Sequence, residues 1–524
     1  MGFIQNMKDL LNKEYNVSVT ENGAVGYRTT GKALLDMNFA VSSMRNESAE
    51  ELVERFVKAY YENPALALRW LFYAGDVRQG LGERRLFRTI LCYLAQSHVD
   101  IARALMPLVP EYSRWDVVVA LLDTPLGDEA AGFIQKQLQE DSANMEKGES
   151  ISLCAKWLPS ENASASYTKC MARLLADKLS MTSRQYRQTL SLYRKYLNVV
   201  EVKMSRGDWA GIDYSAVPSR ANLVYNRAFL RNDEIRRREF LGAVQKGEKQ
   251  IHAGVLYPHD IVHSYFDQEK RAWTGSLRSV DVTLEELWKA LPDFVQGAGS
   301  TLCVADGSGS MFSTVGNSGV RCLDVANALA IYFSERCTGQ FKDNYITFSQ
   351  NPQFVDLSRA GTLHDKLELA LAHNEVANTD IQAVFELILH TAVKNHMPQQ
   401  ELPTNVLILS DMEFDSATRY VVNDRWVSPD ERLFDTIAKS YAARGYRMPR
   451  LVFWNICSRT CTIPVRENDC GVALVSGFSP TIVKMVLGSE LDPYKILVEQ
   501  LSAPRYDAVE NAVEGLLQDS LTEV

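Results

Sequence analysis

Two patterns of apolar residues divide the chain. From about Ser48 to Lys270, apolar residues recur at the three- and four-residue spacing of amphipathic helices, and the runs end at Pro, Gly or Asp. This pattern predicts short helices stacked in pairs. No fixed repeat length is present, so the pattern is compatible with a regular solenoid but does not require one.

The pattern changes near residues 297–300. Beyond this point, runs that are apolar throughout, such as TLCVAD, TNVLILSD and RLVFWNI, alternate with helical stretches. Strands without a polar face are typical of a parallel sheet that helices cover on both sides. We therefore predict an α-helical repeat domain over residues 1–290, a doubly wound parallel-sheet α/β domain over residues 298–490, and a helical tail over residues 491–524.

The composition is that of an ordinary soluble globular protein. Of 524 residues, 46% are hydrophobic and 23% are charged. No run approaches the roughly 18 consecutive apolar residues of a membrane span, and the first residues do not form a secretion signal. Nine cysteines without paired spacing indicate reduced thiols. We therefore expect a cytoplasmic protein with no membrane partner.

The charge of the chain is unevenly distributed. The net charge is −9, yet residues 181–270 contain 15 Lys and Arg against 10 Asp and Glu. A basic segment inside an acidic protein can bind a polyanion. It can also be a solvated helical face with local salt bridges, and charge alone favours this second interpretation.

Oxygen-bearing side chains follow the ends of predicted strands. Asp306 ends one apolar strand, and Ser308 and Ser310 follow it at alternate positions. Thr379 lies at the start of a later helix, and Asp411 ends another apolar strand. Ligands of open parallel sheets bind at the carboxyl ends of strands, and carboxylates with hydroxyls suit a hard divalent cation such as Mg²⁺. Turns and helix caps without a metal are the alternative interpretation.

These residues resemble a known metal site. The pattern Asp-x-Ser-x-Ser, then a Thr in a later loop, then an Asp after a strand is that of the metal-ion-dependent adhesion site (MIDAS) of von Willebrand factor A domains. The resemblance implies that Asp306, Ser308, Ser310, Thr379 and Asp411 bind a divalent cation, and that the open coordination position accepts an acidic side chain from a partner protein.

Other stretches extend the resemblance to most of the chain. They include GDVRQGLGERRLFR, AKWLPSENAS, YPHDIV, VFWNI and VSGFSP. Together they resemble an uncharacterised family catalogued as a domain of unknown function. That family is similar in layout to the TROVE plus von Willebrand factor A proteins, the Ro autoantigen group of RNA-binding proteins. The resemblance implies a ribonucleoprotein component whose helical half binds single-stranded or structured non-coding RNA.

Basic residues of the helical half are the candidate RNA contacts, because Arg and Lys neutralise phosphates and aromatic side chains stack on bases. The candidates are Arg78, Arg84, Arg85, Arg88, Arg184, Arg187, Arg194 and Lys195. Salt bridges within a helix pair are at least as good an account of Arg84 and Arg85, which lie beside Glu83 and near Asp76 in the sequence. Tyr186 and Tyr193, which accompany the second group at helical spacing, fit a helix core better than a stacking surface.

Three functions remain open at this point. The first is a non-enzymatic RNA-binding scaffold with a metal site for a partner, and the second is a protein-interaction adaptor or assembly factor that uses the metal site alone. The third is a metal-dependent hydrolase built on the carboxylates Asp306, Asp411, Glu413 and Asp415. It ranks last, because no general base accompanies the cluster.

Overall fold

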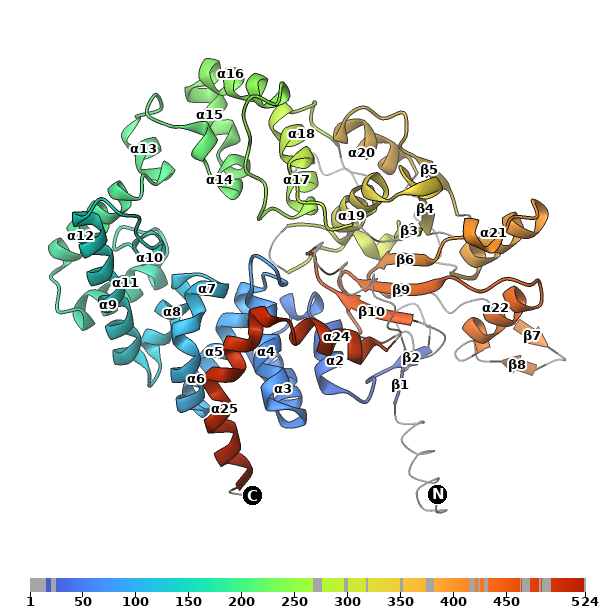
Figure 1. Cartoon of the computed structure of the whole chain (residues 1–524), viewed down its shortest axis with the longest axis horizontal. Coiled ribbons are helices and arrows are strands. Elements are labelled where there is room, and N and C mark those ends of the chain that lie inside the picture. Colours follow the sequence, from blue (N-terminus) through green and yellow to red (C-terminus); the bar gives the residue numbers. More distant parts are fainter. Residues whose placement is uncertain are drawn as a thin grey trace. The chain divides into compact units, whose positions relative to one another are not determined.

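A computed structural model gives the fold of the chain (Figure 1). The structure describes residues 16–19, 25–266, 276–295, 300–316, 319–348, 352–373, 381–413, 420–422, 425–427, 432–461, 463, 472–479, 482 and 492–522.

The chain forms two compact units that differ from the predicted domains. The α/β unit combines Met1–Ser48 with Leu256–Gln500, and the helical unit combines Ala49–Val255 with Leu501–Val524. The helical domain therefore ends about 35 residues before the predicted boundary of 290. The reason is that helices α17 (Pro258–Tyr265) and α18 (Val282–Lys289), from the last part of the predicted helical domain, pack in the α/β unit, where α17 lies against α19 (Cys322–Arg336).

A six-stranded sheet forms the centre of the α/β unit, with the strand order β10-β9-β6-β3-β4-β5. All neighbouring pairs are parallel except β4 and β5. The strands are β3 (Thr301–Asp306), β4 (Asn344–Phe348), β5 (Phe354–Asp356), β6 (Asn405–Ser410), β9 (Arg450–Asn455) and β10 (Val472–Ser476). The predicted doubly wound parallel sheet is confirmed, with an antiparallel edge strand that the sequence did not reveal.

The register of the central strands brings their carboxyl ends together. Ala305 of β3 lies beside Leu409 of β6, and Ser410 of β6 lies beside Asn455 of β9. The chain leaves β3 toward β4 on one side and returns to β6 on the other. Because the strand order reverses at β3, the carboxyl edge between β3 and β6 is the position where open α/β sheets bind ligands.

Helices cover both faces of this sheet (Figure 1). Helix α19 is buried at every residue from Cys322 to Ser334 and packs on β3, β4 and β6. Helices α21 and α22 contribute to the core on the other face, which includes Val304, Ile408 and Phe453. The helices of the unit are α2 (Ala33–Phe39), α17 (Pro258–Tyr265), α18 (Val282–Lys289), α19 (Cys322–Arg336), α20 (Leu363–Ala372), α21 (Ile381–Lys394), α22 (Arg432–Ala442) and α24 (Pro493–Leu501).

Two small antiparallel pairs and an N-terminal segment complete the α/β unit. The pairs are β1 (Val17–Val19) with β2 (Val25–Tyr27), and β7 (Tyr420–Val422) with β8 (Arg425–Val427). After α2, the Ser42 hydroxyl donates to the carbonyl of Asn455 at 3.1 Å. The Asn455 amide donates back to the carbonyl of Phe39 at 2.9 Å. These buried bonds attach the N-terminal segment to the end of β9.

The helical unit is built from short amphipathic helices, as the sequence predicts. Helix α3 buries Leu52, Phe56 and Ala59 at helical spacing. The main helices are α3 (Ala49–Glu62), α4 (Pro64–Gly75), α5 (Arg84–Ser97), α6 (Val99–Leu105), α7 (Val109–Tyr112), α8 (Trp115–Ala120), α9 (Gly127–Glu146), α10 (Cys154–Trp157), α11 (Ser166–Lys178), α12 (Ser183–Tyr196), α13 (Val200–Arg206), α14 (Ser219–Val224), α15 (Asn226–Asn232), α16 (Glu234–Gln245) and α25 (Asp507–Thr522). Among the described residues, no helix is long and apolar enough to cross a membrane.

The C-terminal helix belongs to this unit. Helix α25 packs against α4 and α6. Arg69 of α4, a buried residue, donates to the carbonyl of Leu501 at 2.9 Å and pairs with Asp507 at 3.0 Å and with Glu510 at 2.6 Å. The predicted helical tail is therefore an integral part of the helical unit.

Candidate functional site

Asp306 occupies the carboxyl end of β3 and is buried. Its Oδ1 atom accepts a hydrogen bond from the backbone N–H of Ser308 at 2.8 Å, and its Oδ2 atom accepts one from the Ser410 hydroxyl at 2.6 Å. The first bond closes a tight turn directly after the strand. The second joins the ends of β3 and β6, so the carboxylate is held at the edge where the strand order reverses.

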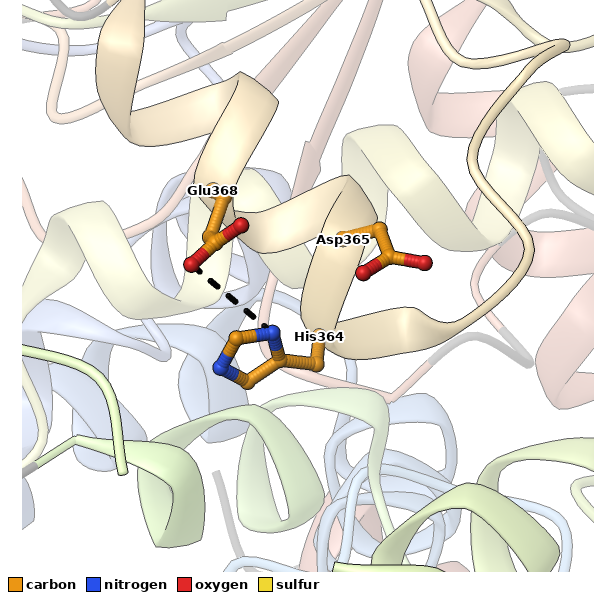
Figure 2. A group of neighbouring side chains, drawn as sticks. All are labelled: His364, Asp365 and Glu368. Carbon is orange, nitrogen blue, oxygen red and sulfur yellow. Dashed lines mark ion pairs between the residues drawn. The ribbon is translucent and has the colours of Figure 1, made fainter. Parts of the chain in front are cut away.

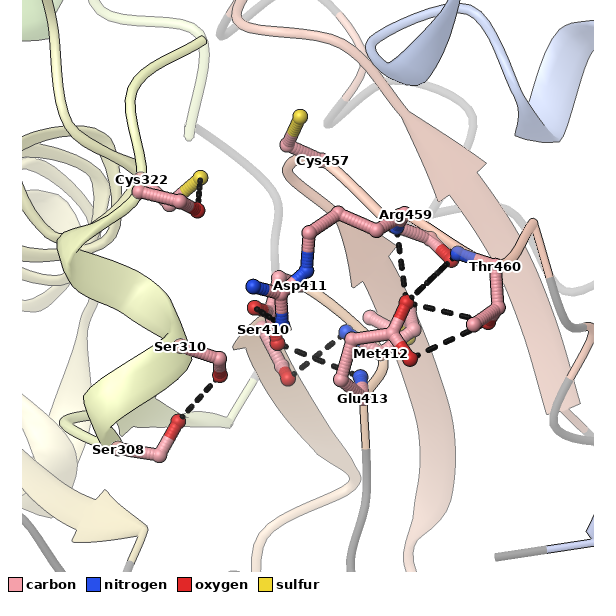
Figure 3. Close-up of polar contacts among 12 residues, drawn as sticks. Ser308, Ser310, Cys322, Ser410, Asp411, Met412, Glu413, Cys457, Arg459 and Thr460 are labelled. Carbon is pink, nitrogen blue, oxygen red and sulfur yellow. Dashed lines mark hydrogen bonds and ion pairs between the residues drawn. The ribbon is translucent and has the colours of Figure 1, made fainter. Parts of the chain in front are cut away.

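Ser308, whose N–H binds this carboxylate, lies beside Ser310 (Figure 3). A short 3₁₀ helix, Gly309–Phe312, begins directly after Ser308 and brings the two hydroxyl groups together. Their Oγ atoms are 2.9 Å apart, at hydrogen-bonding distance. The alternating spacing of the motif thus produces a pair of hydroxyl oxygens on the side of the site that faces Asp411.

Asp411 follows β6 and is fully buried. Its Oδ1 atom accepts the backbone N–H of Glu413 at 3.3 Å, while its Oδ2 atom has no hydrogen-bond partner among the described residues. The guanidinium Nη2 of Arg459 is 3.6 Å from this Oδ2 atom. Burial, and secondly the nearby Asp306 carboxylate, raise the pKa of Asp411 to about 7.

The donor set fits a hard divalent cation. Two buried carboxylates and two hydroxyls offer only oxygen atoms, and Mg²⁺ prefers oxygen ligands. A cation would compensate the buried Asp411 Oδ2 and the repulsion between the two carboxylates. Asp306, Ser308, Ser310 and Asp411 are therefore the residues that would bind it. Thr379, the fifth predicted ligand, lies outside the described residues.

The Glu413 carboxylate has a structural role. Its Oε1 atom accepts hydrogen bonds from the backbone N–H groups of Arg459 and Thr460 at 2.8 and 2.9 Å and from the Ser458 hydroxyl at 3.2 Å. These bonds hold the segment after β9 in place, so the carboxylate is not available as a further metal ligand. Asp415, the fourth carboxylate of the hydrolase hypothesis, lies outside the described residues.

Sequence reasoning missed two residues of this site. Ser410 directly precedes Asp411, and its position at the end of an apolar strand was the available signal. Arg459 carries no such signal, because its proximity to Asp411 depends on the pairing of β9 with β6.

A second group of metal-type side chains lies at the start of α20 (Figure 2). His364, Asp365 and Glu368 each offer an atom within 4.8 Å of the others. Their polar atoms already have structural roles: the His364 Nε2 donates to the carbonyl of Arg278 at 2.9 Å, and the Asp365 carboxylate caps α20 by accepting the Thr362 N–H at 3.1 Å. These interactions stabilise the start of the helix.

The predicted RNA contacts occupy two helices and one loop of the helical unit. Arg84, Arg85 and Arg88 are exposed on α5, and Arg184, Arg187 and Lys195 are exposed on α12. The loop residue Arg78 is also exposed, and its Nη1 is 3.9 Å from the Glu111 carboxylate. Most members of the predicted set therefore have side chains that solvent can reach.

Arg194 has a structural role instead. Its guanidinium donates to the carbonyls of Ala155 and Leu158 at 2.8 and 2.7 Å, and to the Ser160 hydroxyl at 2.8 Å. It thereby holds the segment around the end of α10. Because its guanidinium is bound within the protein, Arg194 is not among the RNA contacts proposed below. Arg187 pairs with the Glu161 carboxylate at 3.1 Å, as the salt-bridge alternative anticipated.

The aromatic residues of the helical unit separate into buried and exposed groups. Tyr186 and Tyr193 are buried, and their hydroxyls donate to the carbonyls of Pro159 and Leu138 at 2.8 and 2.7 Å, which confirms their prediction as core residues. Tyr167 is 59% exposed. Burial raises the pKa of Tyr167, and the positive charge of nearby Arg88 opposes this shift.

Comparisons with known proteins place the chain among uncharacterised relatives. The family described as Domain of unknown function (DUF2828) matches residues 20–109 and 126–300. The family described as Domain of unknown function (DUF7788) matches residues 300–509. An uncharacterised protein of Acanthamoeba polyphaga mimivirus is 28% identical over 528 residues, which cover 93% of this chain and 87% of that protein.

Solved structures match as well. The crystal structure of the Deinococcus radiodurans RO (RSR) protein is 13% identical, with a TM-score of 0.41, and the match covers 87% of this chain and 94% of that chain. The family assignment depends on the sequence match alone. Since that match extends over half of its residues, the chain belongs to the DUF2828 family.

Proposed function

We propose that the α/β unit binds a divalent cation and uses it to bind an acidic side chain of a partner protein. The observation that carries this proposal is the buried Asp411 Oδ2 atom, which has no hydrogen-bond partner in the described part of the chain. A buried carboxylate oxygen without a hydrogen bond is costly even with Arg459 at 3.6 Å, and a cation would reduce that cost.

The ligand set favours binding over catalysis. Ser308 and Ser310 are neutral ligands, so the two carboxylates only balance the charge of a divalent ion. Hydroxyls also bind weakly, which leaves the ion able to accept a stronger ligand such as a carboxylate. Glu413, a member of the proposed hydrolase cluster, binds backbone N–H groups.

Isothermal titration with Mn²⁺, a hard cation that can replace Mg²⁺, tests the cation site in the full chain. The wild type is expected to bind one ion. Ser310→Ala should weaken Mn²⁺ binding, and Asp306→Ala should abolish it. The control is Asp356→Ala, which removes an exposed carboxylate from edge strand β5 and should leave Mn²⁺ binding unchanged. Circular dichroism verifies that each variant is folded. Absence of Mn²⁺ binding by the wild type, or unchanged binding by the folded Asp306→Ala variant, would refute the proposal.

A second candidate function is RNA binding by the helical unit. It is supported by two kinds of exposed side chain in this unit: cations on α5, among them Arg88, and the aromatic ring of Tyr167 on α11. An exposed cation can bind a phosphate, and an exposed aromatic ring can stack on a base. The exposed Arg184 and Lys195 on α12 add positive charge to the same unit. Single-stranded or structured non-coding RNA is the proposed ligand.

Fluorescence anisotropy with a labelled single-stranded RNA and a labelled RNA hairpin tests this function. Tyr167→Ala and Arg88→Gln are each expected to weaken binding about tenfold, as loss of one stacking contact does. Matched controls are Tyr61→Ala and Lys136→Gln, which alter exposed residues of α3 and α9. Failure of the wild type to bind either RNA at low salt leaves the cation-dependent adaptor as the function.

A further inference from the structure

Arg459 lies between the buried carboxylate and solvent. Its side chain is 32% exposed, whereas the side chain of Asp411 is 1% exposed, and the Nη2 atom of Arg459 is 3.6 Å from the Oδ2 atom of Asp411. Figure 3 shows the arginine extending from the segment after β9 back toward Asp411. The same oxygen that a cation would need therefore already faces a positive charge.

The backbone of Arg459 is held in place by the surrounding structure. Its backbone N–H donates to the Glu413 Oε1 atom at 2.8 Å, and the neighbouring Ser458 N–H donates to the Asn455 Oδ1 atom at 2.8 Å. Both Glu413 and Asn455 are buried. Because the backbone of this segment is held on two sides, the arginine side chain starts from a defined point near the site.

A guanidinium and a divalent cation compete for one carboxylate. At a separation of 3.6 Å, Arg459 compensates part of the Asp411 charge. A cation bound to the same oxygen would repel the guanidinium. Binding of the ion would therefore favour a position of Arg459 farther from Asp411, toward the solvent that its side chain already reaches.

We propose that Arg459 is a built-in counter-ion that exchanges between Asp411 and the carboxylate of the acidic partner. Without a cation it pairs with Asp411 and lowers the affinity of the site for metal. With a cation bound it is displaced to the entrance of the site, where its planar guanidinium can bind the partner's carboxylate in a bidentate manner. This role rests on the proposed function. It means that Arg459 both limits the affinity of the site for the cation and recognises the acidic group of the partner.

The test uses the full chain, Mn²⁺ as the ion and an immobilised oligoglutamate peptide as the acidic probe. Arg459→Gln is expected to bind Mn²⁺ about tenfold more tightly by titration calorimetry, because a nearby positive charge has been removed. The same variant should retain less peptide in the presence of Mn²⁺. Arg459→Lys, which keeps the charge but not the bidentate geometry, should bind Mn²⁺ like the wild type and retain less peptide.

A matched control removes the same charge at the other end of the same strand. Arg447 is exposed and precedes β9, whereas Arg459 follows it, so Arg447→Gln should leave both measurements unchanged. If Arg459→Gln binds Mn²⁺ no more tightly than the wild type, the counter-ion role is overturned while the cation site stands. If the wild type itself binds no Mn²⁺, the cation site and the role of Arg459 both fail.

Discussion

At the scale of single residues, the electrostatic cost of the site is concentrated at Asp411. Burial and the Asp306 carboxylate raise the pKa of Asp411 to about 7 from its ordinary value of 3.8. At pH values between about 3.8 and 7, Asp411 is ionised in the unfolded chain but protonated in the folded chain. The contribution of Asp411 to stability therefore decreases as the pH rises from about 4 to 7, and above 7 the folded protein contains a buried charge that Arg459 compensates only in part.

Asp411→Asn is accordingly expected to stabilise the protein in the absence of metal. In the presence of a chelator at pH 8, the melting temperature should rise by roughly 3 °C, because the amide is neutral. Near pH 4 the difference should disappear, since Asp411 is then protonated in the folded wild type. Differential scanning calorimetry at both pH values measures this, and a melting temperature at pH 8 that falls below that of the wild type would contradict it.

The residues of the site were predictable to different degrees. Asp306, Ser308 and Ser310 lie within five consecutive positions, so a local turn is enough to bring them together. Asp411 could be added because parallel strands end at one edge. The role of Arg459 depends on which strand lies next to β6, and no local pattern encodes that choice.

At the scale of elements, length and burial decided what could be predicted. Strands β3, β6 and β9 have six residues each and are almost wholly buried, so their apolar runs are unambiguous. Strand β5 has three residues with an exposed-buried-exposed pattern. So short a run cannot be distinguished from a loop, which is why the antiparallel edge strand was missed.

The helices show the same dependence on local information. Thr182 and Gln185 form a capping box at the start of α12, a signal that is contained in four residues. These four residues do not determine which face of the helix is buried. Tyr186, Tyr193 and Arg194 bond to the carbonyls of Pro159, Leu138 and Ala155, which are 27 to 55 residues away in sequence. Only packing decides that Arg194 is structural.

At the scale of the whole molecule, the two ends of the chain belong to different units. Residues before Ala49 fold with the α/β unit, and residues from Leu501 onward fold with the helical unit. The helical unit is therefore completed only by the last residues of the chain. Arg69 of α4 makes polar contacts with this last part of the chain, to Leu501, Asp507 and Glu510.

Arg69→Ala should therefore destabilise the helical unit by about 2 kcal/mol, because buried hydrogen bonds to charged groups are lost. Urea unfolding followed by circular dichroism measures the change, and limited proteolysis should release the C-terminal segment faster. Arg103→Ala is the matched control, since its pair with Glu129 is solvent-exposed and such pairs contribute little. Equal stability of the Arg69→Ala variant and the wild type would show that α25 is held by apolar packing alone.

The sequence by itself determined the features that depend on neighbouring residues. These are the helical first half, the alternation of buried strands with helices, and the turn at Asp306 that presents two hydroxyls. The tertiary structure alone decided which distant segments meet. It placed Arg459 beside Asp411 and gave Glu413 and Arg194 structural hydrogen bonds. It also decided that the N-terminal segment folds with the α/β unit and the C-terminal segment with the helical unit. The physical reason is that apolar periodicity and capping act over a few residues, whereas strand order and helix docking follow from the burial of whole faces.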